Sequence, residues 1–112
     1  MSTRDPIRLN RRDLSALTDF ARAYLHQDLV VEYGTAMAAG AAFALDASVD
    51  ERRRVADALD VLAAIGNNRP LDSLQRFLVE KVRCAWVPTS PSDLADLARA
   101  IRIGGPRNSP PA

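Results

Sequence analysis

The stretch from residue 48 to residue 66 constrains the fold most, because it carries a helix start signal and a helix stop signal. Ser48 and Glu51 have the spacing of a capping box, in which each side chain accepts a hydrogen bond from the other residue's backbone amide. Gly66 suits the left-handed residue that follows a helix. The apolar spacing between these signals predicts one long amphipathic helix, with an inward face of Val49, Val55, Leu59 and Leu62.

Four further segments repeat this pattern of a start signal followed by apolar residues at helical spacing. Ala and Leu are abundant and Gly is scarce, which also favours helices. The start signals are residues that cap a helix or a proline that fits its first turn. The predicted helices run from Asp13 as N-cap to about Gln27, over 36–46 after Thr35, from Pro70 as first helical residue to Val82, and from Ser90-Pro91 to Gly104.

Two stretches depart from helical spacing. Leu29-Val30-Val31 is a β-prone run that ends at Tyr33-Gly34. Residues 82–87 alternate in character before Pro88, which predicts either an extended connector that lays Trp86 across the bundle or the end of the preceding helix. Within the Ala-rich helix, small residues form a stripe where a second helix could approach closely and form a dimer: Ala36, Gly40 and Ala44.

Length and composition fit one globular domain. The chain has 112 residues, with 47% hydrophobic and 26% charged side chains, which argues against a wholly disordered protein. We therefore predict an all-α single-domain bundle of about five helices with an irregular connector before the last one. Its expected divisions are a flexible basic arm (1–12), the helical domain (13–103) and a flexible Pro-rich tail (104–112).

Charge is distributed unevenly along the chain. The arm carries +3 and residues 102–112 carry +2, whereas residues 13–101 hold 13 acidic and nine basic side chains, a net charge of −4. An acidic body is a poor nucleic-acid binder and suits a basic protein partner. The single Cys84 forms no intramolecular disulfide, and the sequence has neither a secretory signal nor a membrane-spanning stretch. We expect a cytoplasmic protein with no membrane partner.

Polar and aromatic side chains are densest in Tyr24-Leu25-His26-Gln27-Asp28, followed by Tyr33, where the first helix ends. His26 is the only histidine, and no nucleophile motif, metal-ligand spacing or glycine-rich phosphate loop accompanies it. A helix-terminal histidine that bonds backbone carbonyls is the simpler interpretation. We predict no catalytic residue, no metal and no cofactor.

Several charged and aromatic residues are open to two interpretations. Asp28, Glu32 and Tyr33 lie in an irregular link, where they could contact a cationic partner, cap local amides or enter the core. Trp86 is either a core anchor or an interface residue. The run Arg52-Arg53-Arg54 lies among acidic residues, so a solvated mixed-charge face is favoured over a phosphate site.

These features together resemble a known family. Tyr24 to Asp28, Glu32-Tyr33-Gly34, the Ala-rich helix with Phe43 and the capping-box helix are similar to the small helical immunity proteins of bacterial contact-dependent growth inhibition systems (CdiI type). Cys84 followed by Pro88 matches the same family. The resemblance covers residues 14–102 and is most specific at His-Gln-Asp, although this chain has Leu29 where the family usually has Trp.

The resemblance implies an immunity protein that binds the toxic C-terminal domain of a polymorphic toxin, commonly a nuclease, and neutralises it by occlusion without catalysis. Members of such a family bind differing toxins, so a motif that they share is expected to hold the fold rather than contact the toxin. The motif residues in this chain are Tyr24, Leu25, His26, Gln27, Cys84 and Trp86. The expected toxin-binding residues come from the acidic surface around this motif: Asp28, Glu32, Tyr33, Asp57 and Asp60.

Three alternatives remain from the residues alone. One is a helical adaptor or regulator that docks a partner through the Ala-rich groove. Another is a small nucleic-acid-binding protein that uses the arm and residues 52–54, and the weakest is a hydrolase centred on His26. We expect a monomer or weak homodimer.

Overall fold

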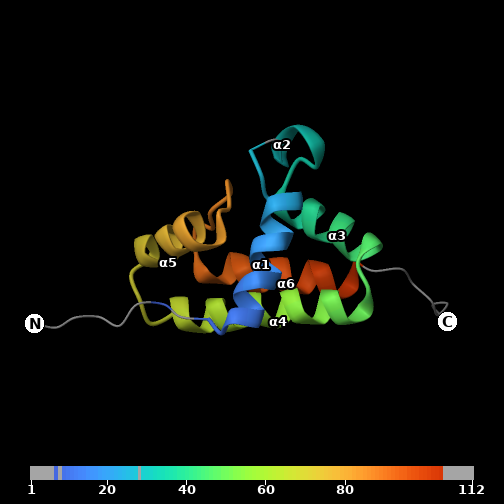
Figure 1. Cartoon of the computed structure of the whole chain (residues 1–112). Coiled ribbons are helices and arrows are strands. Elements are labelled where there is room, and N and C mark those ends of the chain that lie inside the picture. Colours follow the sequence, from blue (N-terminus) through green and yellow to red (C-terminus); the bar gives the residue numbers. More distant parts are fainter. Residues whose placement is uncertain (1–6, 8, 28, 105–112) are drawn as a thin grey trace, which may run out of the picture.

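The computed structural model describes residues 7, 9–27 and 29–104 (Figure 1). Within these residues the chain is an all-α single domain, as predicted, and contains no strand. The elements are α1 (Arg11–Tyr24), α2 (Leu29–Glu32), α3 (Ala36–Asp46), α4 (Val49–Gly66), α5 (Leu71–Phe77), the π-helical turn η1 (Leu78–Val82) and α6 (Pro91–Ile103).

Helix α6 lies at the centre of the packing. It runs antiparallel along α4, α3 packs against it, and α1 crosses α4 (Figure 1). The side chains of α6 that face these neighbours are fully buried, and each buried leucine contributes about 1.5–3 kcal/mol relative to an exposed one. These buried residues are Leu94, Leu97, Ala98 and Ile101.

The predicted capping box at the start of α4 is confirmed. The amide of Glu51 donates to Ser48 Oγ over 3.1 Å, and the amide of Ser48 donates to Glu51 Oε1 over 2.9 Å. Thr35 likewise caps α3, because its hydroxyl accepts from the amide of Ala38 over 3.0 Å. Such caps each stabilise a helix by about 1 kcal/mol. Val49, however, is 57% exposed and does not join the inward face.

The predicted role of Gly66 is wrong. Among the described residues, only Gly34 and Arg83 have a positive φ, and Gly66 is the last residue of α4 itself. A Cβ at position 66 would lie 2.8 Å from Leu74 Cδ2. The glycine therefore makes room for the buried Leu74 side chain of α5 and does not form a left-handed turn.

The start of α1 also differs from the prediction. Asn10, not Asp13, is the N-cap, and its Oδ1 accepts from the amide of Asp13 over 2.7 Å. Asp13 instead lies in the first turn, where a carboxylate is favoured by the helix dipole. We expected a flexible arm over 1–12, but α1 begins at Arg11, and Ile7 and Leu9 pack against the core. The tail residues 105–112 lie outside the described residues.

The stripe of small residues serves the bundle itself. Ala36, Gly40 and Ala44 are all buried within the chain. A Cβ at Gly40 would lie 2.7 Å from Leu97 Cδ1 and 3.2 Å from Ile101 Cγ1. The helix that approaches this stripe is therefore α6 of the same chain. The stripe is not available to a second copy or to another partner.

The two helices after Pro70 show smaller differences. Pro70 is the N-cap of α5 rather than its first helical residue. Ser90 is the N-cap of α6, but its hydroxyl contacts Ser92 instead of a backbone amide. Asp93 supplies the local bonds, because its Oδ2 accepts from both the amide and the hydroxyl of Thr89.

The segment before α6 contains both structures that its sequence allowed. The helix continues beyond Phe77 as η1 and ends at Arg83, and the predicted irregular connector follows. Trp86 of this connector is half-buried against the core. Two hydrogen bonds anchor the connector: Ala85 N donates to Leu25 O over 2.8 Å, and Gln75 Nε2 donates to Pro88 O over 2.7 Å.

Arg83 adopts φ 69° and ψ 35°, a left-handed conformation that costs a non-glycine residue about 1–2 kcal/mol. We predict that Arg83→Gly raises the free energy of unfolding by about 1 kcal/mol, because the relief of strain exceeds the added entropy of the unfolded chain. Urea unfolding measures the change. Arg83→Ala removes the same charge but keeps the strain, so an equal gain in that variant would contradict this explanation.

Candidate functional site

The motif at the end of α1 is a junction of three elements. Between ring centroids, Tyr24 lies 5.9 Å from Phe20 and 5.6 Å from Phe43. The ring of Tyr33, which directly follows α2 in the sequence, lies 5.7 Å from that of Tyr24. Tyr24 Oη donates to Asp46 Oδ2 over 3.0 Å, which joins the end of α1 to the end of α3. Desolvation, helped by this hydrogen bond, raises the pKa of Tyr24 to about 12, so the hydroxyl keeps its proton.

The backbone of the motif makes the remaining connections. Leu25 is buried, and its carbonyl accepts from Ala85 of the connector. The carbonyl of His26 accepts from the amide of Leu29 over 2.9 Å and so starts α2. His26 Nε2 lies 3.4 Å from Glu32 Oε1. Gln27 is exposed, and the predicted toxin-binding residue Asp28 lies outside the described residues.

The β-prone run predicted at Leu29 is instead the single helical turn α2. Tyr33 N and Gly34 N both donate to Leu29 O, over 2.7 and 3.1 Å, and Gly34 at φ 88° then directs the chain into α3. This turn buries Leu29 and leaves Val31 87% exposed. In Figure 1, α2 projects from the bundle on the side opposite α4. The projection presents Val31 and Glu32 to solvent, while Tyr33 is half-buried against Tyr24.

A groove of about 240 Å³ lies where α1, α3 and α4 meet. Its buried base includes Phe20 and Val55, and the half-buried rings of Tyr24 and Phe43 form part of its wall. We call it the aromatic groove. Its exposed charged residues are Asp19, Glu51 and Arg54. Tyr24 belongs both to this groove and to the ring cluster that contains Tyr33, so the groove and the α2 projection adjoin.

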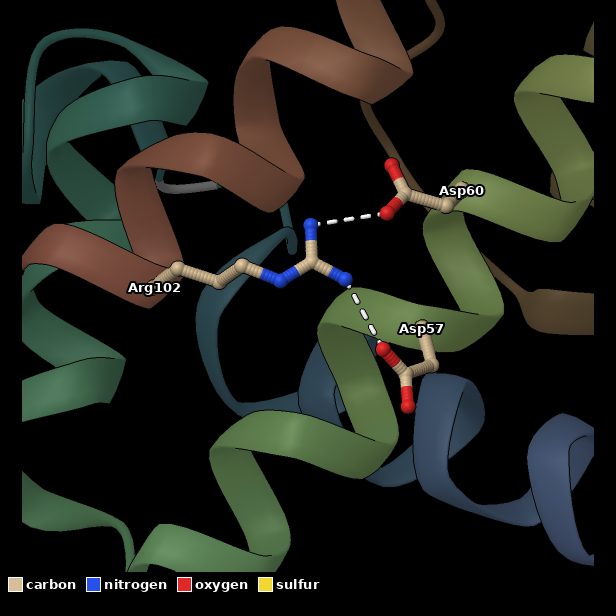
Figure 2. Close-up of polar contacts among 3 residues, drawn as sticks. All are labelled: Asp57, Asp60 and Arg102. Carbon is tan, nitrogen blue, oxygen red and sulfur yellow. Dashed lines mark hydrogen bonds and ion pairs between the residues drawn. The ribbon is translucent and has the colours of Figure 1, made fainter.

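The other two predicted toxin-binding residues lie elsewhere. Arg102 Nη2 binds Asp57 Oδ1 over 2.8 Å, and Arg102 Nη1 binds Asp60 Oδ2 over 2.7 Å (Figure 2). This cluster links α4 to α6, away from α2 in Figure 1. Both carboxylates are about half exposed, so the ion pairs add at most about 1 kcal/mol each. The structure therefore brings Glu32 and Tyr33 together but does not bring Asp57 and Asp60 to them.

Sequence reasoning missed the aromatic groove and Val31. From the sequence, Val55 is expected only as an inward residue of its helix, and Glu51 only as a helix cap. No local pattern could reveal the groove, because its lining comes from three helices that meet only in the fold. The exposure of Val31 depends on the one-turn helix that replaced the expected extended run.

Burial raises the pKa of the Cys84 thiol to about 12, so it carries no thiolate at neutral pH. No group of three His, Cys, Asp or Glu residues in the described ranges is arranged to hold a metal ion. None of the helices in this part of the chain has the length and apolarity needed to cross a bilayer.

Comparisons with protein families, curated proteins and solved structures find no match to this chain.

We predict that Tyr24→Phe lowers the free energy of unfolding by about 1 kcal/mol at pH 7, because it removes the hydrogen bond to Asp46. The folded-state pKa of Tyr24, about 12, exceeds the ordinary value of 10.0, so this stability is complete below pH 10 and is lost between pH 10 and 12. The difference between the parent and the variant in urea unfolding should shrink over that range.

Tyr33→Phe is the matched control for this prediction, since the Tyr33 hydroxyl makes no hydrogen bond within the described residues. It should change stability by less than about 0.5 kcal/mol. Equal losses from the two substitutions would show that the Tyr24–Asp46 bond has no special role.

Proposed function

We propose that this protein is an immunity protein. In this proposal it binds the toxic domain of a contact-dependent growth inhibition system or a related polymorphic toxin, and it neutralises that domain by occlusion. The toxin is a nuclease, whose substrate-binding surface is basic. The observation that carries the proposal is the surface formed by the α2 projection and the adjoining aromatic groove.

The shape and chemistry of this surface suit a protein partner. Val31 offers an exposed apolar side chain, and the neighbouring rings offer the aromatic contacts that are enriched at protein interfaces. Four carboxylates lie on it or at its edge, those of Asp19, Glu32, Asp46 and Glu51, and Arg54 is the opposing cation. This excess of negative charge favours a basic partner and speeds its encounter.

The resemblance of residues 14–102 to small helical immunity proteins supports the same proposal, with the motif of Tyr24 to Gln27 as scaffold and the surrounding surface as the binding region. The adaptor alternative loses the groove on which it relied, because the small-residue stripe is buried against α6. The nucleic-acid alternative rests on the arginines of the described residues. One depression is lined by Arg52, Arg53 and Arg102 together with Val49, and Arg102 is already paired with Asp57 and Asp60. Arg12, Arg53 and Arg54 share their depression with equally many carboxylates, those of Asp13, Asp50 and Asp57.

Co-expression tests the function. The chain is expressed together with the toxin domain encoded directly upstream of its gene, and growth and complex formation are measured. We expect rescue of growth and a stable one-to-one complex. A toxin domain that kills its host while this protein neither rescues growth nor binds it would refute the proposal.

Glu32→Lys locates the binding surface. We expect this reversal to raise the dissociation constant for the toxin domain at least tenfold by calorimetry, because Glu32 lies on the α2 projection. Asp72→Lys makes the same charge change on exposed α5 and should stay within about threefold of the parent. Thermal melts check that both variants fold. Equal weakening by the two variants would mean that net charge, not this surface, governs binding.

A further inference from the structure

The size of the aromatic groove limits what it can hold. Its volume of about 240 Å³ is smaller than the roughly 300–1,000 Å³ of pockets that bind cofactors and drug-sized ligands. One protruding side chain of a partner protein is an occupant of suitable size. The groove lies at the junction of α1, α3 and α4, whose backbones are fixed by the core, so it is present before a partner arrives.

The wall of the groove suits a cation with a flat or extended apolar part. Tyr24 and Phe43 present half-buried rings, with their centroids 5.6 Å apart and their planes inclined by 74°. Phe20, beneath them, lies 4.8 Å from Phe43. Aromatic faces attract guanidinium and ammonium groups, and the aliphatic stems of such side chains pack on apolar surface.

The charged residues around the groove also favour a cationic occupant. Asp19 is exposed and takes part in no ion pair or hydrogen bond among the described residues. Glu51 uses Oε1 for the Ser48 amide. Asp46 lies next to the groove through its bond to Tyr24. Arg54 is the opposing charge, and it forms no ion pair with Asp19 or Glu51 within 4.0 Å.

We propose that the aromatic groove receives one arginine side chain of the partner, with its guanidinium against the ring of Tyr24 or Phe43 and its N–H groups directed at Asp19. Arginine is favoured over lysine because its planar group stacks on aromatic rings and donates to carboxylates in a fork. This inference rests on the proposed function, because it names the group on the basic toxin surface that the protein recognises.

The probe for this inference is N-acetyl-arginine methylamide, titrated into the full chain at low salt and followed by amide chemical shifts. We expect weak, saturable binding that shifts the amides around Asp19, Ala23 and Phe43. The citrulline analogue keeps the shape of arginine without its charge and should bind at least fivefold more weakly. Equal binding of the two analogues, or shifts centred on Asp57 and Asp60, would overturn the proposal.

Two substitutions of exposed residues give changes of opposite sign. Asp19→Asn should weaken binding of the arginine analogue at least threefold, because it removes the unpaired carboxylate. Arg54→Gln should strengthen binding at least twofold, because it removes the opposing cation. An uncharged apolar occupant would respond to neither change, so unchanged affinity in both variants would overturn the proposal.

The outcome is separable from the test of the immunity function. Neutralisation of the toxin by a chain that does not bind the arginine analogue would leave the immunity function and overturn the arginine groove. Binding of the analogue with the expected response to Asp19→Asn, in a chain that neutralises no toxin, would support the groove and overturn the immunity function.

Discussion

The close contact between α3 and α6 is the constraint on which the rest of this bundle depends. A Cβ at position 40 would come within 2.7 Å of Leu97 Cδ1 and 3.2 Å of Ile101 Cγ1, so the glycine allows this close approach of α6 side chains to the α3 backbone. The approach fixes the position of α3, to which the end of α1 is then tied through Tyr24 and Asp46. The aromatic groove takes its shape from these fixed helices, so its geometry follows from a glycine that does not line it.

The motif at the end of α1 and the α2 projection have different physical tasks in this molecule. Tyr24 and Leu25 join α1 to α3 and to the connector through one side-chain and one backbone hydrogen bond. Val31 and Glu32 make few contacts with the bundle and extend from it. Substitutions on the projection therefore leave the hydrogen bonds of this junction in place.

The sequence predicted the elements whose signals are local. Thr35 and Ser48 bond amides three residues away, so their caps are visible in the sequence itself. Gly66 was misassigned because its reason lies in Leu74 of another helix, and the left-handed Arg83 has no local signal. For the link that carries Glu32 and Tyr33, the sequence allowed recognition of a partner, local capping or burial. The groove beside it had no sequence signal, because Asp19, Phe43 and Val55 come together only after three helices pack.

The burial of Cys84 has a practical consequence. The residue is 5% exposed, and its amide donates to the carbonyl of Leu78 at the start of the π-helical turn. A thiol-specific reagent therefore reacts only when the connector detaches from the bundle, since the closed state offers neither access nor thiolate. The rate of labelling reports how often that detachment occurs, without any engineered label. Labelling of Cys84 therefore measures the opening of the connector, the segment that is hydrogen-bonded to the end of α1.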